Sequence, residues 1–388
     1  MMLAPDKPPI PNSVVGDLGL PSGRACLALT LVLAACASSP GESEGEEGEG
    51  EGEGEGEGEG EGDPAPVDGE GEGEGEAAPG DGEADDGDDV QQNIPFVFVI
   101  AMENKANDGI YGNASAPYIN DVLMTEYGSA SAYSDCIAGF VPSEPHYIWL
   151  EAGTNVFDDH AFFLDSPPSG PNSTADTRHI AAQLAAQTDA TWRSYQQGLN
   201  DDTGACPIHN AGVYAAKHDP FVFFQDIAGA PPAADSALCA AHHRPFTATS
   251  FEADLAAADV DAYTFITPDL CHDMHGNRAC TNGCTSSSAE ACISEGDLFL
   301  EQTVPPIIDF MDAHGGVLLI VWDESEGSSS TQPFLVIGPH VKRGHVSSVG
   351  IDHSSYVKSL QEIFGIDVDS RVQDAEDFED FFESGFFP

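Results

Sequence analysis

A serine at position 143 opens a stretch that could do nucleophilic chemistry. The segment Pro142-Ser-Glu-Pro-His-Tyr147 places this serine just before an apolar, helix-compatible run. A serine at a helix start lies beside unpaired backbone N–H groups and the positive end of the helix dipole, where a phosphate group can bind. The alternative is that Ser143 only caps the helix, which is a common role for serine.

Carboxylate, amide and imidazole side chains follow four apolar runs that are typical of buried strands. Such a concentration of negative charge at one crevice repels itself unless a cation neutralises it, so the pattern predicts a divalent metal site. The residues are Glu103 and Asn104 after residues 94–102, Asp323 and Glu324 after 316–322, Asp273 and His275 after 263–267, and His353 after 334–337.

The elements that must position these residues alternate along the chain. Segments with helical periodicity separate the four apolar runs, at residues 116–126, 177–187, 251–258, 297–313 and 354–364. Buried strands alternating with helices predict an α/β fold with a mostly parallel sheet covered on both faces. In such a fold, ligands bind at the carboxyl ends of the strands, where the polar residues lie.

The first 36 residues have the pattern of an export signal. Arg24 precedes an apolar run at residues 25–35, which is too short to span a bilayer and suits a signal peptide. The run ends in Leu33-Ala-Ala-Cys36, which resembles a bacterial lipobox and implies lipid attachment to Cys36. A plain secretory signal is the alternative. With Ser38 two residues after Cys36, we expect a lipid-anchored protein of the cell envelope, sent to the outer membrane.

Acidic residues dominate the chain, and they are concentrated in residues 41–90, which hold 23 acidic residues and no basic ones. We therefore expect residues 37–91 to be a disordered, solvated tether. Calcium buffering by this segment is an alternative without a supporting ligand spacing. After residue 90 there are 42 acidic residues against 10 basic ones, so the folded part carries a net charge of about −32 with histidine neutral. A body this acidic excludes nucleic acid as a partner.

Seven cysteines remain after the signal and the lipid site. An exported domain oxidises most of its cysteines, so up to three disulfides and one odd thiol are expected. A zinc site at the last four cysteines is the alternative, although the paired Cys-x-x-Cys spacing is missing. The seven are Cys136, Cys206, Cys239, Cys271, Cys280, Cys284 and Cys292.

Ten short motifs, in this order, resemble the bacterial phosphoesterase family, the acid phosphatases and phospholipases C of the alkaline phosphatase superfamily. The resemblance covers roughly residues 94–366 and implies a three-layer α/β/α sandwich. The motifs are Glu103-Asn104, residues 116–120, Pro142-Ser-Glu-Pro-His-Tyr147, residues 192–195, residues 218–224, residues 267–275, Gly296-Asp297, residues 321–325, residues 338–344 and Asp352-His-Ser-Ser355.

The resemblance also implies roles for individual residues. Ser143 matches the nucleophile of the superfamily, and His146 lies near a position that contacts the phosphate. The metal ligands implied are Glu103, Asn104, Asp323 and Glu324, while Asp273, His275 and His353 complete the metal and phosphate pocket. The segment after Glu-Asn, residues 105–109, departs from the usual aromatic-bearing pattern of the family.

These assignments predict a metal-dependent phosphomonoesterase that acts through a phosphoserine, with His275 or His353 protonating the leaving oxygen. The oxygen-rich ligands favour Mg, Ca or Mn as the divalent metal, and the histidines leave Zn or Fe open. The substrate is a small phosphate ester or a phospholipid, and contact with the membrane is expected only through the lipid anchor.

Two alternatives stay open. A phospholipase C activity is disfavoured because the catalytic domain, residues 92–367, is followed only by residues 368–388, which we expect to form an acidic tail or a surface strip. A metal-binding surface lipoprotein without turnover is the second alternative.

Overall fold

The computed structural model describes residues 94–135, 137, 142–326 and 331–388. The predicted signal peptide, Cys36, the tether and Cys136 lie outside these residues. Within the described part, no helix combines the length and the apolar character that a membrane span requires.

An eight-stranded sheet forms the centre of the described domain, in the order β5-β4-β6-β1-β7-β8-β2-β9. The first five of these strands pair in parallel, while β8 is antiparallel to both β7 and β2. This confirms the predicted mostly parallel sheet. The strands are β1 (Val97–Met102), β2 (Gly128–Ala130), β4 (Trp192–Gln197), β5 (His243–Phe246), β6 (Tyr263–Thr267), β7 (Val317–Trp322), β8 (Phe334–Ile337) and β9 (Val346–Ser347), with β3 (Tyr133–Ser134) and β10 (Ile351–Asp352) forming a separate pair.

Helices cover both faces of this sheet. The longer ones are α3 (Ser143–Ala152), α4 (Ile180–Gln187), α7 (Ala248–Ala256), α8 (Ala289–His314) and α9 (His353–Ile363). The short ones are α1 (Asn107–Ile110), η1 (Tyr118–Leu123), α2 (Met124–Glu126), η2 (Ala216–His218), η3 (Pro220–Phe223), α5 (Gln225–Ala228), α6 (Ala237–His242) and η4 (Glu379–Phe381).

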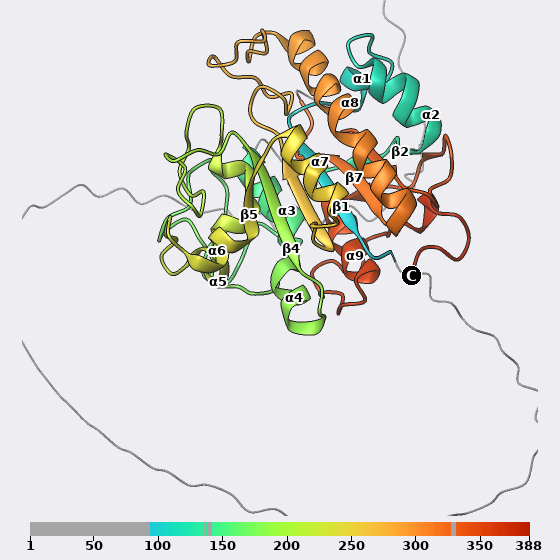
Figure 1. Ribbon diagram of the computed structural model, residues 1–388. Helices are drawn as coiled ribbons and strands as arrows, with labels where there is room; N and C mark the ends of the chain where they lie inside the picture. Colours follow the sequence, from blue (N-terminus) through green and yellow to red (C-terminus); the bar gives the residue numbers. More distant parts are fainter. Residues whose placement is uncertain (1–93, 136, 138–141, 327–330) are drawn as a thin grey trace, which may run out of the picture. The chain divides into compact units, whose positions relative to one another are not determined.

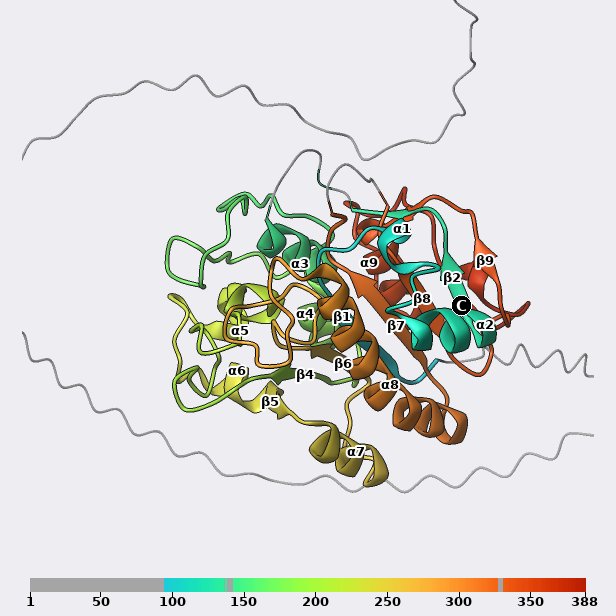
Figure 2. The same ribbon diagram turned by 90° about the horizontal axis from the view of Figure 1, so that it is seen from above.

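Successive side chains of the central strands point to opposite faces of the sheet and pack against two separate helical layers. In β1, Val97 and Val99 belong to one buried apolar cluster, while Phe98 and Ile100 belong to another. The first cluster includes residues of α3, α4 and α9, and the second includes residues of α7 and α8. Figures 1 and 2 show these two helical layers on opposite sides of the strands. The fold is therefore the predicted three-layer α/β/α sandwich.

The C-terminal segment differs from its prediction as a tail or surface strip. Phe378, Phe381 and Phe382 are buried in the same apolar cluster as α3 and α9, and Phe334 packs against the first two. Lys342 donates its backbone N–H to the carbonyl of Phe381. The segment therefore belongs to the core, because burying three phenylalanines outweighs the solvation of the acidic residues between them.

Three disulfides join the six cysteines within the described residues, as predicted. They are Cys206–Cys239, Cys271–Cys280 and Cys284–Cys292. The zinc alternative is wrong, because the four cysteines it needed are paired with one another. Two of the bridges brace the segment between β6 and α8, which contains Asp273 and His275.

A buried histidine, His179, links α3 to α5 within the helical layer that contains α3. The His179 ring contacts Glu151 Oε1 at 3.4 Å through Nδ1 and Asp226 Oδ2 at 3.1 Å through Nε2. Burial lowers the pKa of His179, but the hydrogen bonds to Asp226 and Glu151 outweigh it and raise the pKa to about 9. The imidazolium is therefore the form that the folded protein holds at neutral pH.

We expect His179→Gln to lower the free energy of unfolding by about 3 kcal/mol at pH 6, since it leaves the buried Glu151 carboxylate without its cation. A raised histidine pKa contributes stability that is complete below pH 6.5 and is lost as the pH rises through about 9. The measurement is denaturant unfolding of both proteins at pH 6 and above pH 9, with His314→Gln as an exposed control. A His179→Gln cost that stays the same at both pH values would contradict the expectation.

Candidate active site

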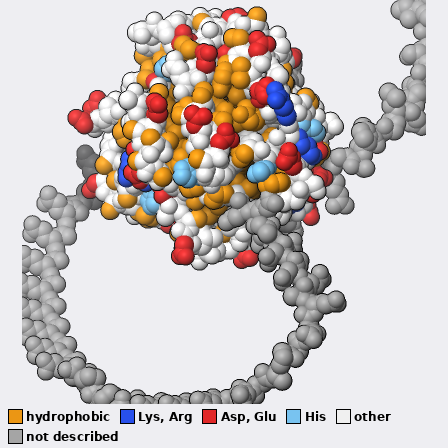
Figure 3. Space-filling view, turned by 45° about the vertical axis from the view of Figure 1, so that its right-hand side comes forward, with side chains coloured by type: hydrophobic (Ala, Val, Ile, Leu, Met, Phe, Trp, Pro, Cys, Tyr) orange, Lys and Arg blue, Asp and Glu red, His pale blue; other side chains and the backbone are white. Residues whose placement is uncertain are grey.

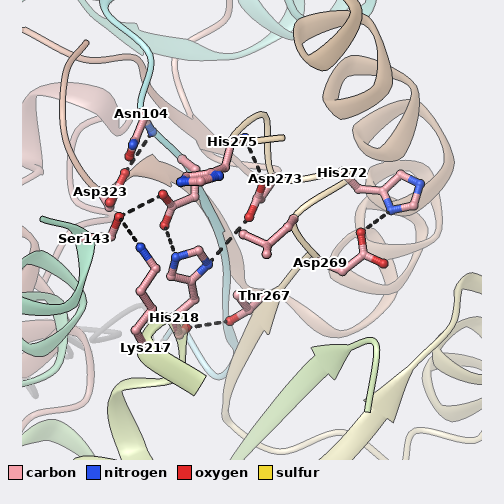
Figure 4. A network of polar contacts seen from close by, with 12 residues as sticks. Asn104, Ser143, Lys217, His218, Thr267, Asp269, His272, Asp273, His275 and Asp323 are labelled. Atoms are coloured by element: carbon pink, nitrogen blue, oxygen red, sulfur yellow. Dashed lines mark hydrogen bonds and ion pairs between the residues drawn. The ribbon is translucent and has the colours of Figure 1, made fainter. Parts of the chain in front are cut away.

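Ser143 is the first residue of α3, and its hydroxyl does not cap that helix. Pro142 occupies the N-cap position in an extended conformation. The buried Ser143 hydroxyl donates to Glu103 Oε2 at 3.1 Å, and its Oγ accepts from Lys217 Nζ at 3.3 Å (Figure 4). The alternative of a capping serine is therefore wrong, and the Oγ lies between a carboxylate and an ammonium group.

Glu103, Asn104 and Asp323 converge because β1 and β7 are neighbouring parallel strands that end at the same edge. Met102 and Trp322, the last residues of the two strands, are directly paired. Asn104 then turns into a left-handed conformation with φ of 41°, and its backbone N–H donates to Asp323 Oδ1 at 3.0 Å. Asparagine is among the few residues besides glycine that adopt this conformation readily, so the turn suits the residue at position 104.

The position of the Asn104 side-chain amide indicates whether a cation fits between the neighbouring carboxylates. One of its two terminal atoms lies 2.9 Å from Glu103 Oε2 and 3.2 Å from Asp323 Oδ1. Without a cation, the amide nitrogen belongs at that position, because it can donate to both carboxylates. With the oxygen there, three oxygen atoms face a common point, which is the arrangement that a hard divalent cation needs.

Two further predicted residues lie on the Asp323 side of this cluster. His146, one turn into α3, has its Nε2 3.8 Å from Glu324 Oε2. His353 is buried at the start of α9, with Nδ1 2.7 Å from Tyr133 Oη and Nε2 2.6 Å from the carbonyl oxygen of Asp323. Since both of its ring nitrogens are occupied, His353 holds the loop of Asp323 in place and is poorly placed to protonate a leaving group.

The remaining predicted residues lie on the opposite side of Glu103, together with His218, which had no assigned role. His218 Nε2 is 3.1 Å from Glu103 Oε1, and its Nδ1 is 3.6 Å from Asp273 Oδ2. His275 donates its backbone N–H to Asp273 Oδ1 at 2.7 Å, while its ring lies 6.1 Å from that of His218. Figure 4 shows Asn104, Ser143, Asp273, His275 and Asp323 gathered in this network. His146, Glu324 and His353 lie beside it, on the Asp323 side.

Lys217 and Asp165 belong to this network, and the sequence analysis missed both. Lys217 Nζ contacts Asp165 Oδ2 at 2.5 Å as well as Ser143 Oγ at 3.3 Å. Asp165 Oδ1 also accepts the backbone N–H of Glu144 at the start of α3, at 3.1 Å. The motif at residues 218–224 marked the neighbourhood of Lys217. Asp165 lies in a loop with no strand-end or motif signal.

Burial and mutual repulsion control the charges of the cluster. Burial, reinforced by the charge of Glu103, raises the pKa of Asp273 and Asp323 well above the usual carboxyl range and that of Glu324 to about 8. Burial also raises the pKa of Glu103, although Lys217 opposes this shift. Carboxylates this costly to ionise are expected where a bound cation compensates the charge.

The side chains that could bind a cation here are of different types: carboxylates, an amide and a hydroxyl. The Asn104 amide lies between the carboxylates of Glu103 and Asp323, and the Ser143 hydroxyl joins this group through Glu103 Oε2. In the described part of the chain, no group of three or more His, Cys, Asp or Glu side chains is placed to hold a metal ion. A cation here would therefore depend on the amide and hydroxyl oxygens as well.

Comparison with known proteins relates this chain to phosphoesterases. The model of the phosphoesterase family matches residues 122–367. A phosphatidylinositol-3-phosphatase of Mycobacterium tuberculosis is 26% identical over 271 residues, which are 70% of this chain and 77% of the relative. A probable acid phosphatase of Kluyveromyces lactis is 24% identical over 68% of this chain, and the match spans 56% of that protein.

A third relative and one solved structure complete the comparison. A phosphate-repressible acid phosphatase of Penicillium chrysogenum is 23% identical over 63% of this chain and 52% of its own length, so the chain spans about half of each fungal relative. The phosphonate monoester hydrolase of Silicibacter pomeroyi aligns over 75% of this chain and 76% of its own, with a TM-score of 0.47 and 11% identity.

Proposed function

The chain belongs to the phosphoesterase family and is a hydrolase of phosphate esters, and from this premise we propose that it is a metal-dependent phosphomonoesterase acting through a phosphoserine at Ser143. The observation that carries the proposal is the position of Ser143 Oγ between Glu103 Oε2 and Lys217 Nζ. Hydrolysis of a small aryl phosphate by the purified domain, with and without added divalent metal, tests it.

The first step is attack by Ser143 on the phosphorus atom. Glu103 Oε2 accepts the hydrogen bond of the hydroxyl, takes its proton as Oγ bonds to phosphorus, and returns the proton to Oγ when water breaks the Oγ–P bond. Lys217 Nζ lies beside the same oxygen, where its charge stabilises the negative charge that develops on Oγ and on the phosphoryl oxygens. A divalent cation held by Glu103, Asn104, Asp323 and Glu324 would supply further activation of the hydroxyl and neutralise phosphoryl charge.

A general acid must then protonate the leaving oxygen, and the geometry favours His275 over His353. The His275 ring is oriented by a 2.9 Å bond from Nδ1 to the carbonyl oxygen of Gly276, which directs Nε2 to proton transfer. His353 would have to break one of its two buried hydrogen bonds first. In the second step, neutral His275 takes a proton from the water that hydrolyses the phosphoserine and so regains its starting form.

Monoester hydrolysis is the first choice over phosphodiester cleavage of phospholipase C type. All three relatives described above are named as phosphatases, one of them on a phosphatidylinositol. The two activities separate in parallel assays of phosphate release from an aryl phosphate and of diacylglycerol release from phosphatidylcholine. We expect the first to proceed and the second to be absent.

We expect Lys217→Met to lower kcat/KM for an aryl phosphate about 100- to 1,000-fold, because the variant keeps the side-chain length but loses the charge beside Ser143 Oγ. Lys217→Arg should recover part of this loss. The measurement is steady-state kinetics of the three proteins, together with thermal unfolding to confirm the fold. If the arginine and methionine variants were equally impaired, the charge would not be the reason.

We also propose that the protein is exported and lipid-anchored through Cys36, with its domain held away from the outer membrane by the acidic tether. The support is the sequence pattern of residues 24–38. Mass spectrometry of the N-terminal peptide should find an acylated Cys36, and Cys36→Ala should release the protein from the membrane fraction. A mature chain that begins elsewhere would contradict this location.

A further inference from the structure

An exposed apolar pair lies directly beside the catalytic network. Phe163 is 50% exposed and Leu164 is 74% exposed, which makes Leu164 the most exposed large apolar side chain among the described residues. The next residue along the chain is Asp165, the partner of Lys217. Asp165 is therefore within two hydrogen-bond lengths of the nucleophile, and the apolar pair is attached to it covalently.

The local backbone explains why the Phe163 side chain faces outward. Residues 155–162 form a hairpin in which Val156 is bridged to Ala161, with bonds from Phe157 N to the carbonyl oxygen of His160 and from Phe162 N to that of Asn155. In extended backbone, alternate side chains share a face. Phe157 and Phe162 accordingly enter the core, while Val156 and Phe163 are exposed.

The loop that carries the pair is held to α3 by hydrogen bonds to both the backbone and the side chain of Glu144. Asp165 Oδ1 accepts the Glu144 backbone N–H, and Glu144 Oε2 accepts the Ser166 backbone N–H at 2.6 Å. The buried Glu144 also accepts from Asn172 Nδ2 at 3.1 Å through Oε1. These bonds fix the backbone that follows the apolar pair relative to the start of α3, where Ser143 lies.

The exposed fractions of the side chains show which part of the site reaches the surface. The side chains of Glu103, Asp273, Asp323 and Ser143 are buried, whereas those of Lys217 and Asp165 are 18% and 33% exposed. Phe163 and Leu164 directly precede Asp165 in the chain, so a phosphate ester that reaches Ser143 past Lys217 brings its non-phosphate part toward this pair. The folded part is strongly acidic, and the face drawn in Figure 3 carries few Lys or Arg side chains, so a large negatively charged partner is disfavoured.

We infer that Phe163 and Leu164 are specificity-determining residues that bind the apolar group of the substrate, which is therefore a small phosphate monoester carrying an alkyl or aryl group. This inference rests on the proposed function and adds the substrate class to it. The apolar group gains affinity by covering these two side chains, while the phosphate is held at Ser143. Small polar esters such as sugar phosphates lack this contact.

The test compares octyl phosphate with ethyl phosphate as substrates of the wild type and of the double variant Phe163→Ser/Leu164→Ser. We expect the ratio of their kcat/KM values to fall about tenfold in the double variant, because the octyl chain loses its apolar partners. Leu238→Ser is the matched control. It removes an exposed leucine of α6 in a groove that includes Trp192, at the amino end of β4.

Binding of octylphosphonate and methylphosphonate by calorimetry gives a second readout that does not need turnover. The ratio of the two dissociation constants should fall by the same factor in the double variant and stay at the wild-type value in Leu238→Ser. Unchanged ratios in both assays overturn the inference. If the double variant instead only loses binding to phosphatidylcholine vesicles, the pair is a membrane contact and the inference is wrong. A wild type that binds both phosphonates without hydrolysing either ester contradicts the proposed function alone.

Discussion

Ser143→Ala should lower phosphate release from an aryl phosphate by at least about 1,000-fold. The variant removes the only atom that lies within hydrogen-bonding distance of both Glu103 Oε2 and Lys217 Nζ among the contacts described here. A water molecule can enter the vacated space, but it lacks the fixed alignment of a side chain, so a large part of the rate is lost. The measurement is kcat under saturating substrate, with thermal unfolding to show that the domain is intact.

Ser131→Ala is the matched control for this variant. Ser131 is an exposed serine after β2 whose hydroxyl donates to the carbonyl oxygen of Ser347. We expect its kcat to stay within about twofold of the wild type, since surface substitutions of this kind have small effects. Equal rates for Ser143→Ala and Ser131→Ala would remove Ser143 from the reaction and would favour a domain that binds phosphate or metal without turnover.

Asp323→Asn should produce two effects of opposite sign. The affinity for a divalent cation should weaken at least about 100-fold and activity should fall with it, because a carboxylate is replaced by a weaker neutral ligand. After dialysis against a chelator, however, the melting temperature should rise by a few degrees. One of several buried, mutually repelling charges is then gone, while Oδ1 still accepts the N–H of Asn104.

Isothermal calorimetry with Mn and Mg, and thermal unfolding with and without metal, measure these two effects. Asp201→Asn makes the same change of charge at an exposed turn and should show neither. A variant that binds metal as tightly as the wild type would place the cation elsewhere. A variant with normal metal affinity and lower stability would show that Asp323 is a structural residue.

Much of the fold could be predicted because the central strands are apolar throughout. β1, β6, β7 and β8 are buried along their whole length, and each was recognised as an apolar run. The edge strand β5 and its neighbour β4 were missed, since they mix polar and charged residues such as Arg193, Gln196 and Arg244 with apolar ones. Their pairing with β6 and with each other depends on neighbours far along the chain.

Helix boundaries show the same limit. The segment predicted as a helix at residues 116–126 is a π-helix, Tyr118–Leu123, followed by the short α2. Asp297, on the distant α8, accepts the backbone N–H groups of Tyr118 and Ile119 at 2.9 Å each. A side chain from α8 therefore fixes where this helix starts. The periodicity of the segment itself could not predict this start.

The active-site residues at strand ends were predictable for a topological reason, and those on irregular loops were not. Parallel strands bring Glu103 and Asp323 together whatever the loops do. Asp165 reaches the site only because the loop after α3 folds back onto the start of that helix. The contacts of His353 could not be predicted from the sequence either, since its partner Tyr133 precedes it by 220 residues.

The central claim is that Ser143 carries the phosphoryl group during turnover. The most direct test mixes the metal-loaded protein with an aryl phosphate, quenches the reaction in acid within a few turnovers and determines the masses of the peptides. We predict one added phosphoryl group on the peptide that contains Ser143, and none in the Ser143→Ala protein. A phosphoryl group on a different residue, or steady turnover with Ser143 always unmodified, would contradict the claim.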